Sequence, residues 1–142
     1  MTYAMPMNRR RGPASTYTNL GLETQVMAAS PVRLITLLFD GARAAIAKAR
    51  LHFSQNNPAA RGEAISKAIN IVENGLKASL DTNAGGELAV NLSTAYDVIV
   101  RNLLLANLNS DTNRLDTADK LLADIGSAWR EANDPLPPSS SN

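Results

Sequence analysis

The run from Glu63 to Glu87 constrains the fold most, because it predicts a long amphipathic helix that ends in a tight turn near Asp81. Its apolar residues recur at spacings of four, three, four and four and therefore share one helical face: Ile65, Ile69, Val72, Leu76 and Leu80. The acid-first pairs Glu63–Lys67 and Glu73–Lys77 support a helix on the opposite face. No group in the run is suited to acid, base or metal chemistry, so the pattern favours packing or binding.

Turn and capping residues place three further helices around this one. Ser30-Pro31 combines an N-cap with a proline at the first helical position, and Asn57-Pro58 repeats that signal before the second helix. Gly85-Gly86 precede a third helix, and Asp111 or Thr112 caps a fourth. Because the connections are short, consecutive helices should be antiparallel neighbours.

The inward faces of these helices follow from their apolar periods. The first helix should bury Ile35, Leu38, Phe39, Ala42, Ile46, Ala49 and Phe53. The third should bury Leu88, Leu92, Ala95, Tyr96, Ile99, Leu103 and Ala106. The fourth should bury Leu115, Ala118, Leu122, Ile125 and Trp129. We find no useful strand alternation, so the prediction is an all-α, antiparallel four-helix bundle with a short N-terminal cap helix.

The ends of the chain differ in composition from the middle. Residues 1–15 mix Met, Arg, Gly and Pro without a period, and residues 135–142 read PLPPSSSN. We expect both to be disordered tails, with one helical domain over residues 16–134 between them. Arg9, Arg10 and Arg11 are interpreted as a solvated part of the first tail, not as a phosphate or membrane site.

Residues 16–29 form a short segment that is cut from the first long helix by Ser30-Pro31. Such a short helix is unstable alone, and its apolar residues need a docking surface: Tyr17, Leu20, Leu22 and Val26. Two interpretations stay open. The segment is either a permanent fifth element of the core or a removable cap over a groove that a partner later occupies.

The composition argues against catalytic, cofactor and metal sites and against a nucleic-acid partner. The chain has no cysteine and one histidine, His52, so neither a catalytic triad nor a di-iron Glu-x-x-His site can be built. We therefore predict no enzyme, cofactor or metal, and interpret His52 as a surface residue near a helix C-terminus. With 14 basic and 13 acidic residues, nothing favours nucleic acid.

Hydropathy and the cysteine count indicate the cellular compartment of the protein. The N-terminus has no apolar leader, and the run from Leu34 to Phe39 is too short to cross a bilayer. Absence of cysteine suits a reducing environment. We expect a cytoplasmic protein without membrane insertion.

Small residues and charge pairs leave two questions open. Gly41, Gly75 and Gly126 lie inside predicted helices, where they indicate either close helix contacts or helices that separate easily for a client. Asp116–Lys120 is interpreted as a surface ion pair, whereas Asp97–Arg101 is either a surface ion pair as well or a structural lock or partner contact.

Four parts of the chain carry a resemblance to a known family, in its order and spacing: Ala29 to Ala42, Ser66 to Asp81, Gly85 to Asp111, and Ala128-Trp129. With the Gly-Gly-Glu turn and the grouping Tyr96-Asp97…Arg101, the chain resembles the FliS-type flagellin export chaperones across roughly residues 15 to 133.

The resemblance implies a helical bundle and a function. It implies a cytoplasmic chaperone that binds the C-terminal segment of flagellin, prevents premature polymerisation and delivers it to the flagellar export apparatus. It also implies a tyrosine in the N-terminal region, matched by Tyr17, and competition between flagellin and the segment around it. Tyr96, Asp97 and Arg101 join Tyr17, Leu20, Leu22 and Val26 as candidate partner-binding residues. The alternative is a self-associating structural or adaptor bundle without a flagellin client, and a homodimer stays open in either case.

Overall fold

The computed structural model describes residues 29–133, which form helices and connecting turns and contain no strand. The elements are α4 (Pro31–Ser54), α5 (Pro58–Ile71), the π-helix η1 (Val72–Lys77), α6 (Gly86–Leu108) and α7 (Thr112–Asn133). The predicted all-α class is thereby confirmed. The cap segment and both predicted tails lie outside the described residues, and the predicted domain boundaries stay predictions.

The helix starts follow the predicted capping residues. The Ser30 side chain accepts a hydrogen bond from the Arg33 N–H at 3.1 Å, and proline follows at the first helical position. Asn57 caps α5 through its side chain, and the Asp111 carboxylate accepts the Asn113 N–H at 2.9 Å before α7. Gly86 has φ +58°, a left-handed conformation that glycine adopts without strain.

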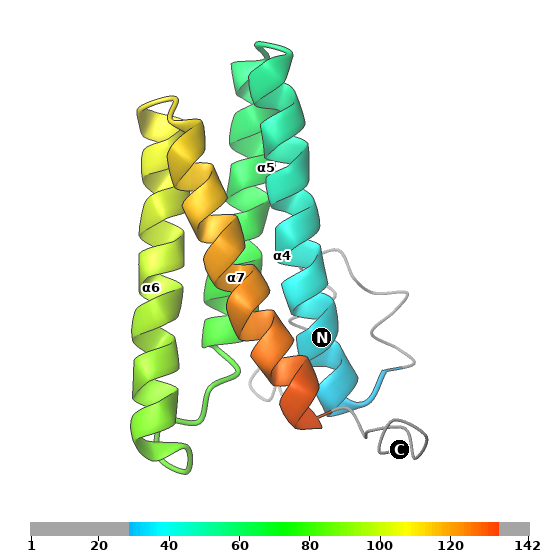
Figure 1. Cartoon of the computed structure of the whole chain (residues 1–142), viewed down its shortest axis with the longest axis vertical. Helices are drawn as coiled ribbons and strands as arrows, with labels where there is room; N and C mark the ends of the chain where they lie inside the picture. Colours follow the sequence, from blue (N-terminus) through cyan, green and yellow to red (C-terminus); the bar gives the residue numbers. More distant parts are fainter. Residues whose placement is uncertain (1–28, 134–142) are drawn as a thin grey trace, which may run out of the picture.

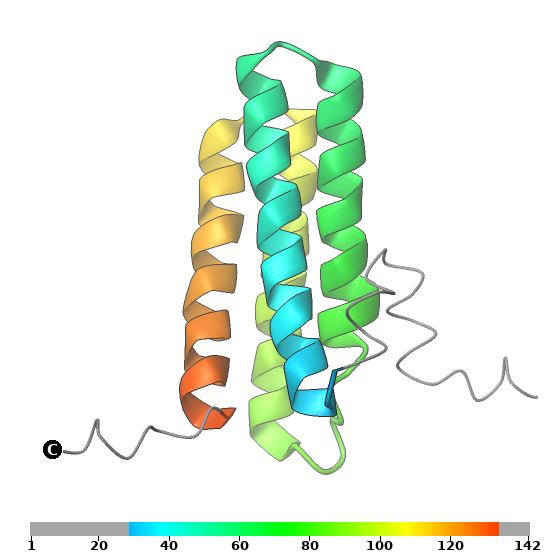
Figure 2. The same ribbon diagram turned by 90° about the vertical axis from the view of Figure 1, so that its right-hand side faces the viewer.

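Consecutive helices run in opposite directions, as predicted from the short connections (Figure 1). The first helix, α4, packs against both α5 and α7, and η1 continues the line of α5. Helix α6 packs against α7, α5 and η1, and it forms one edge of the bundle in Figure 1. Figure 2 shows α4 and α5 in front, with α6 behind them.

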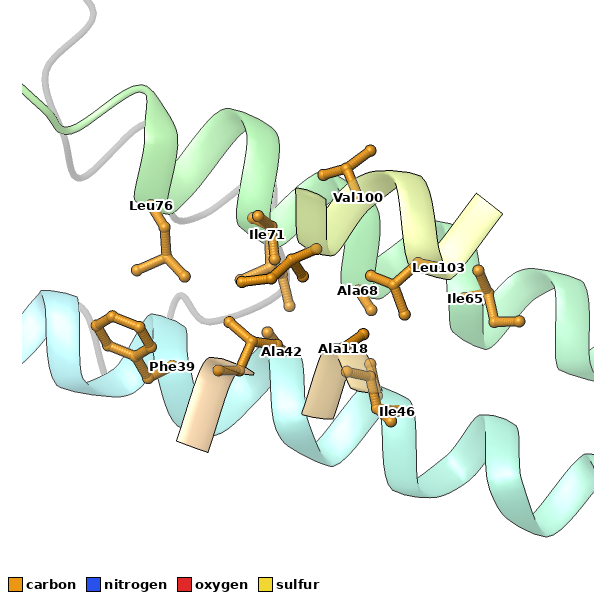
Figure 3. Packing of buried hydrophobic residues seen from close by; sticks show 14 of the residues in the cluster. Phe39, Ala42, Ile46, Ile65, Ala68, Ile71, Leu76, Val100, Leu103 and Ala118 are labelled. Atoms are coloured by element: carbon orange, nitrogen blue, oxygen red, sulfur yellow. The ribbon is translucent and has the colours of Figure 1, made fainter. Parts of the chain in front are cut away.

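The core is a single cluster of mainly aliphatic buried side chains, and Figure 3 shows the ring of Phe39 among them. Its largest fully buried members come from every element: Leu38, Ile46, Ile65, Ile71, Val72, Leu76, Ile99, Leu103, Leu115 and Leu122. Phe39 and Tyr96 join α4 to α6 with ring centroids 6.5 Å apart. Alanines fill the narrow positions between these side chains, and Ile35, Phe53, Ile125 and Trp129 pack against the cluster while remaining partly exposed.

The second helix differs from the prediction in its last part. We expected one continuous helix to about Asp81, but the α-helix ends at Ile71 and continues as the π-helix η1. Here the apolar spacing is four residues, from Val72 to Leu76 to Leu80. The π turn is wider than an α-helical turn, and Val72, Gly75 and Leu76 of η1 are all buried.

One residue of the predicted α6 core face is exposed. Leu88 was expected to point inward but retains 66% of its accessible surface. It lies in the first turn of α6, which extends beyond the end of η1 in Figure 1. The buried residue of this turn is the adjacent Ala89, which is 4% exposed, so the core face of α6 begins one position later than predicted.

Surface charges pair both between helices and along α7. Arg50 pairs with Asp116 and Arg130 with Asp40, so two of the α4–α7 bridges lie toward opposite ends of the contact. The predicted pair Asp116–Lys120 is wrong because Asp116 faces α4, and Lys120 lies 3.4 Å from Asp124 instead.

A third bridge lies between those two. Arg43 Nε lies 2.9 Å from Asp119 Oδ1, and this hydrogen bond raises the pKa of Arg43. Exposed pairs of this kind contribute little each, but their opposite signs fix the register of α4 against α7.

Gly126 lies at a close contact between α7 and Phe39 of α4. A Cβ atom there would lie 3.2 Å from Cγ of Phe39, which is tighter than an ordinary van der Waals contact. Close helix approach is therefore the reason for this glycine, one of the two explanations predicted from the sequence. Gly75 is buried in η1, and Gly41 lines a groove at the surface of α4.

Within residues 29–133, α6 is the one helix that is long and apolar enough to cross a membrane. Only a third of its most apolar window is buried in the bundle. A core helix meets the same length and composition criteria, so the observation describes α6 and does not establish a membrane span. Its apolar residues extend beyond the core face onto the outward face.

Candidate functional site

A groove between α4 and α5 is a concave feature of the bundle surface that could bind a partner. It encloses about 380 Å³, and its lining comes from two helices: Arg33, Leu37, Asp40, Gly41, Ala44, Ala45, Lys48, Ala64 and Lys67. Glycine and alanine form the middle of the groove because the two helices carry small residues where they face each other. Small side chains allow another helix to approach the backbone closely.

The rim of the groove is mostly basic. Arg33, Lys48 and Lys67 contribute three positive charges, and the single carboxylate, Asp40, already pairs with Arg130 of α7. The groove therefore combines an apolar floor with a positively charged edge. This arrangement suits an amphipathic helix with acidic residues beside its apolar face.

The predicted site residues do not form one surface in the described part of the chain. Tyr96 is 3% exposed and packs on Phe39 in the core, where burial raises its pKa to about 12. Asp97 and Arg101 are exposed on α6. Tyr96 therefore acts in packing, whereas its two charged neighbours are available at the surface. Tyr17, Leu20, Leu22 and Val26 lie outside the described residues.

Asp97 has a different ionic partner from the one expected. Its carboxylate lies 2.7 Å from Nζ of Lys77, at the end of η1, and this hydrogen bond raises the pKa of Lys77. Within residues 29–133, Arg101 makes no salt bridge to Asp97. The bridge to Lys77 ties η1 to α6 and leaves the Arg101 guanidinium available for a partner.

Sequence reasoning missed the apolar residues on the outward face of α6. Val90, Leu104 and Leu108 are 52%, 54% and 77% exposed, and Val98 is 44% exposed. They belong to a second apolar stripe, separate from the core stripe. The sequence signal was the high total hydropathy of this helix, which exceeds what one buried face requires.

The described residues contain no group of His, Cys, Asp and Glu that could hold a metal ion. His52 lies in the last turn of α4, as predicted, but it is half-buried and not a simple surface residue. Its Nδ1 atom is buried and has no hydrogen-bond partner within the part of the chain that the structure describes. The bundle surface thus offers binding geometry, and no catalytic arrangement is formed by these residues.

Comparison with known proteins shows which family this chain belongs to. The family model described as "Flagellar protein FliS" matches residues 13–135 of the chain. The chain belongs to the FliS family. This match spans all four helices and extends at both ends into residues that the structure does not describe.

Individual FliS relatives are similar over most of their length. The flagellar secretion chaperone FliS of Salmonella typhimurium strain LT2 is 50% identical over 115 residues, covering 81% of this chain and 85% of the relative. The protein of the same name from Escherichia coli K12 is 43% identical over 116 residues, covering 82% and 85%. That of Vibrio cholerae is 31% identical over 128 residues, covering 90% of each chain.

Membership of the FliS family confirms several predictions made from the sequence. The chain is a flagellar secretion chaperone, a cytoplasmic binding protein and not an enzyme. The alternative function, a self-associating structural or adaptor bundle without a flagellin client, is therefore not supported. The FliS name does not by itself assign a groove, a cap or an oligomeric state to this chain.

Proposed function

We propose that this FliS chaperone holds the C-terminal segment of flagellin as a helix in the α4–α5 groove and so prevents premature polymerisation. The observation that carries the proposal is a groove with a small-residue floor and a basic rim on a member of a secretion chaperone family. Flagellin polymerises through its terminal helices, so masking one of them blocks self-association. The loaded chaperone then delivers its client to the flagellar export apparatus.

The groove has the length that a short client helix requires. Its α4 wall runs from Arg33 to Lys48, which corresponds to about 22 Å of helix axis at 1.5 Å per residue. About fifteen residues of a client helix would lie along it. Because ordering a disordered client costs several kcal/mol, contact along the whole groove is needed instead of a single anchoring point.

Residues 17–27, the cap segment, are proposed to cover the same groove in the absence of client. The described chain begins at Ala29, which packs against the core, and the groove begins one helical turn later at Arg33. Eleven residues in helical form extend about 16 Å and would cover most of the groove wall. A client must displace this segment before it binds.

The first test measures binding of flagellin by calorimetry. Intact flagellin should bind, and flagellin without its C-terminal segment should bind at least about 100-fold more weakly, because the apolar contact surface is lost. Binding should also show a negative heat-capacity change. Equal affinity of the intact and truncated clients would contradict the proposed mechanism.

A matched pair of substitutions places the client in the groove. Ala44 lines the groove and Ala47 does not, and both are exposed on α4. Ala44→Arg fills the groove and should weaken binding of the C-terminal peptide at least about tenfold, whereas Ala47→Arg adds the same charge and should leave binding unchanged. If the two variants bind equally well, the peptide occupies a different surface.

Hydrogen exchange tests the cap segment. Amides of residues 17–27 should exchange faster than those of the core helices, because a short segment opens at low free-energy cost. Adding the C-terminal peptide should accelerate exchange there and slow it along Arg33 to Lys48. A segment that exchanges as slowly as the core and does not respond to the peptide would be a permanent fifth element of the bundle.

A further inference from the structure

The positive charges that line the α4–α5 groove have no ionic partners in the described part of the chain. Arg33, Lys48 and Lys67 all line the groove, and none of them forms an ion pair with a described residue. By contrast, Arg43 and Arg50, which lie on the side of α4 that faces α7, each pair with an aspartate of that helix. Unpaired cations therefore gather at the groove, and such a rim favours an anionic ligand.

The carboxylates closest to this rim along the chain do not neutralise it. Glu63 precedes Lys67 by four residues, yet these two described residues form no ion pair, and Lys67 lines the groove whereas Glu63 does not. Asp40 does line the groove, but it pairs with Arg130 of α7. The rim is thus available to a carboxylate that comes from another molecule.

Two of the three cations lie at one end of the groove, on opposite walls. Helices α4 and α5 are antiparallel and joined by a short turn (Figure 2). Lys48 lies six residues before the last residue of α4, and Lys67 lies nine residues after the first residue of α5. The two positions therefore differ by only about 4.5 Å along the bundle axis, at 1.5 Å per residue. We call this part of the groove the lysine end.

The opposite end of the groove is less charged. Arg33 lies there alone, about 22 Å from Lys48 along α4. Helix α5 lines the groove through Ala64 and Lys67, close to the lysine end, so both helices bound the groove at that end. A helical client is asymmetric as well, because its C-terminal end carries the negative end of the helix dipole and, at the last residue of a chain, a free carboxylate.

We propose that the lysine end binds the terminal α-carboxylate of the client, so that the last residue of flagellin lies between Lys48 and Lys67. This inference rests on the proposed function of the groove. The client helix then runs parallel to α4, with its C-terminal end beside the α4–α5 turn and its earlier residues extending toward Arg33. The two ammonium groups offset the repulsion between the α-carboxylate and the last carbonyl groups of its own helix. Such a contact selects a chain terminus over an internal helix with the same apolar pattern.

Two forms of one peptide test this contact. The peptide is the last segment of flagellin, of about fifteen residues, with either a free C-terminal carboxylate or a C-terminal amide. In calorimetry at low salt, the chaperone should bind the acid at least about threefold more tightly than the amide, because the amide offers the lysines no charge. The difference should shrink between about 0.05 M and about 0.5 M salt.

The sign of the difference distinguishes a direct contact from a general effect on the peptide. Amidation removes a negative charge from the end of the helix where the dipole disfavours it, and so promotes helix formation. A peptide whose terminus points into solvent should therefore bind more tightly as the amide. Tighter binding of the acid requires a positive group beside the terminus.

Substitutions of lysine assign that positive group. Lys48→Gln combined with Lys67→Gln should abolish the preference for the acid or reverse it in favour of the amide. Lys120→Gln removes an exposed lysine of α7 that does not line the groove, and should leave the preference at its wild-type value. Because all three lysines are exposed, the melting temperatures of these variants should match that of the wild type.

Cross-linking tests the direction of the client helix. A photoreactive phenylalanine analogue next to the last residue of the acid peptide should label the chain beside Lys48 and Lys67. The same group at the first residue of the peptide should label the chain near Arg33. The reverse pattern would mean that the client runs antiparallel to α4, and would overturn the proposal.

The proposal is also overturned if the amide binds as tightly as the acid, or if the double lysine variant keeps the preference for the acid. Salt-dependent binding that amidation does not change would assign the lysines to acidic side chains of the client instead of its terminus. Weak binding by Ala44→Arg together with equal affinities for acid and amide would reject this inference and leave the proposed groove intact. Equal binding by Ala44→Arg and Ala47→Arg would reject the groove itself.

Discussion

Replacing Leu122 by alanine should lower the free energy of unfolding by about 3–4 kcal/mol, within the usual range for a fully buried leucine. Leu122 is 0% exposed and lies at the centre of the α7 face that packs into the core. The variant loses the transfer free energy of the removed atoms and leaves a cavity between rigid helices. Urea denaturation should show a lower midpoint with an unchanged slope, and the melting temperature should fall by roughly 10–15 °C.

The matched control is Leu51→Ala. Leu51 belongs to α4 but is 51% exposed, so its truncation should change the free energy of unfolding by less than about 0.5 kcal/mol. Similar losses of unfolding free energy for Leu51→Ala and Leu122→Ala would contradict the different burial of these two leucines in the structure. The comparison thus tests the packing of α7 as well as the cost of one cavity.

The helices could be predicted from sequence because their limits are set by local chemistry. The side chains of Ser30 and Asn57 each cap a helix by accepting a backbone N–H from its first turn. Pro31 and Pro58 suit the first helical position in any context. The core faces of α4 and α7 could be predicted from the apolar period alone, because a helix of more than twenty residues repeats its buried face over several turns. These features depend little on what the helix packs against.

Features that depend on neighbouring elements were not predictable in the same way. The change from α-helix to π-helix at Val72 has no signal in the apolar period, although Val72 and Leu76 are both buried as that period predicts. Asp116 pairs with Arg50 because α7 lies beside α4, although an i,i+4 partner was available in its own helix. Leu88 is exposed because the core face of α6 begins at the adjacent Ala89.

The candidate groove was missed for a related reason. Its floor consists of Gly41, Ala44 and Ala64, and glycine and alanine also fill the core. These residues form a binding surface only because α4 crosses over α5. Sequence reasoning selected charged and aromatic residues instead. Of these, Tyr96 is in the core, and only Asp97 and Arg101 lie on a described surface. Small residues shared by two adjacent helices are a better signal for a helix-binding groove.

Replacing Trp129 by alanine should cost about 3 kcal/mol of stability, toward the lower end of the range for a buried tryptophan because the side chain is only partly buried. Trp129 packs against the core from the last part of α7, and its indole Nε1 donates to Oγ1 of Thr36 at 3.2 Å. The substitution removes both the apolar contact and the hydrogen bond. Thermal unfolding measures their sum, and an unchanged melting temperature would place the residue outside the structural core.

A double-mutant cycle separates the two contributions. Trp129→Phe keeps most of the apolar contact but leaves Thr36 without the indole donor, and should cost about 1 kcal/mol more than the lost ring area. Thr36 is 6% exposed, and its hydroxyl also lies 3.5 Å from the Val32 carbonyl oxygen. In a Thr36→Val background the indole N–H has no hydroxyl to donate to. Trp129→Phe should therefore lower the free energy of unfolding less in that background than in wild type. Strictly additive effects would show that the hydrogen bond contributes nothing and that Trp129 holds α7 against α4 by packing alone.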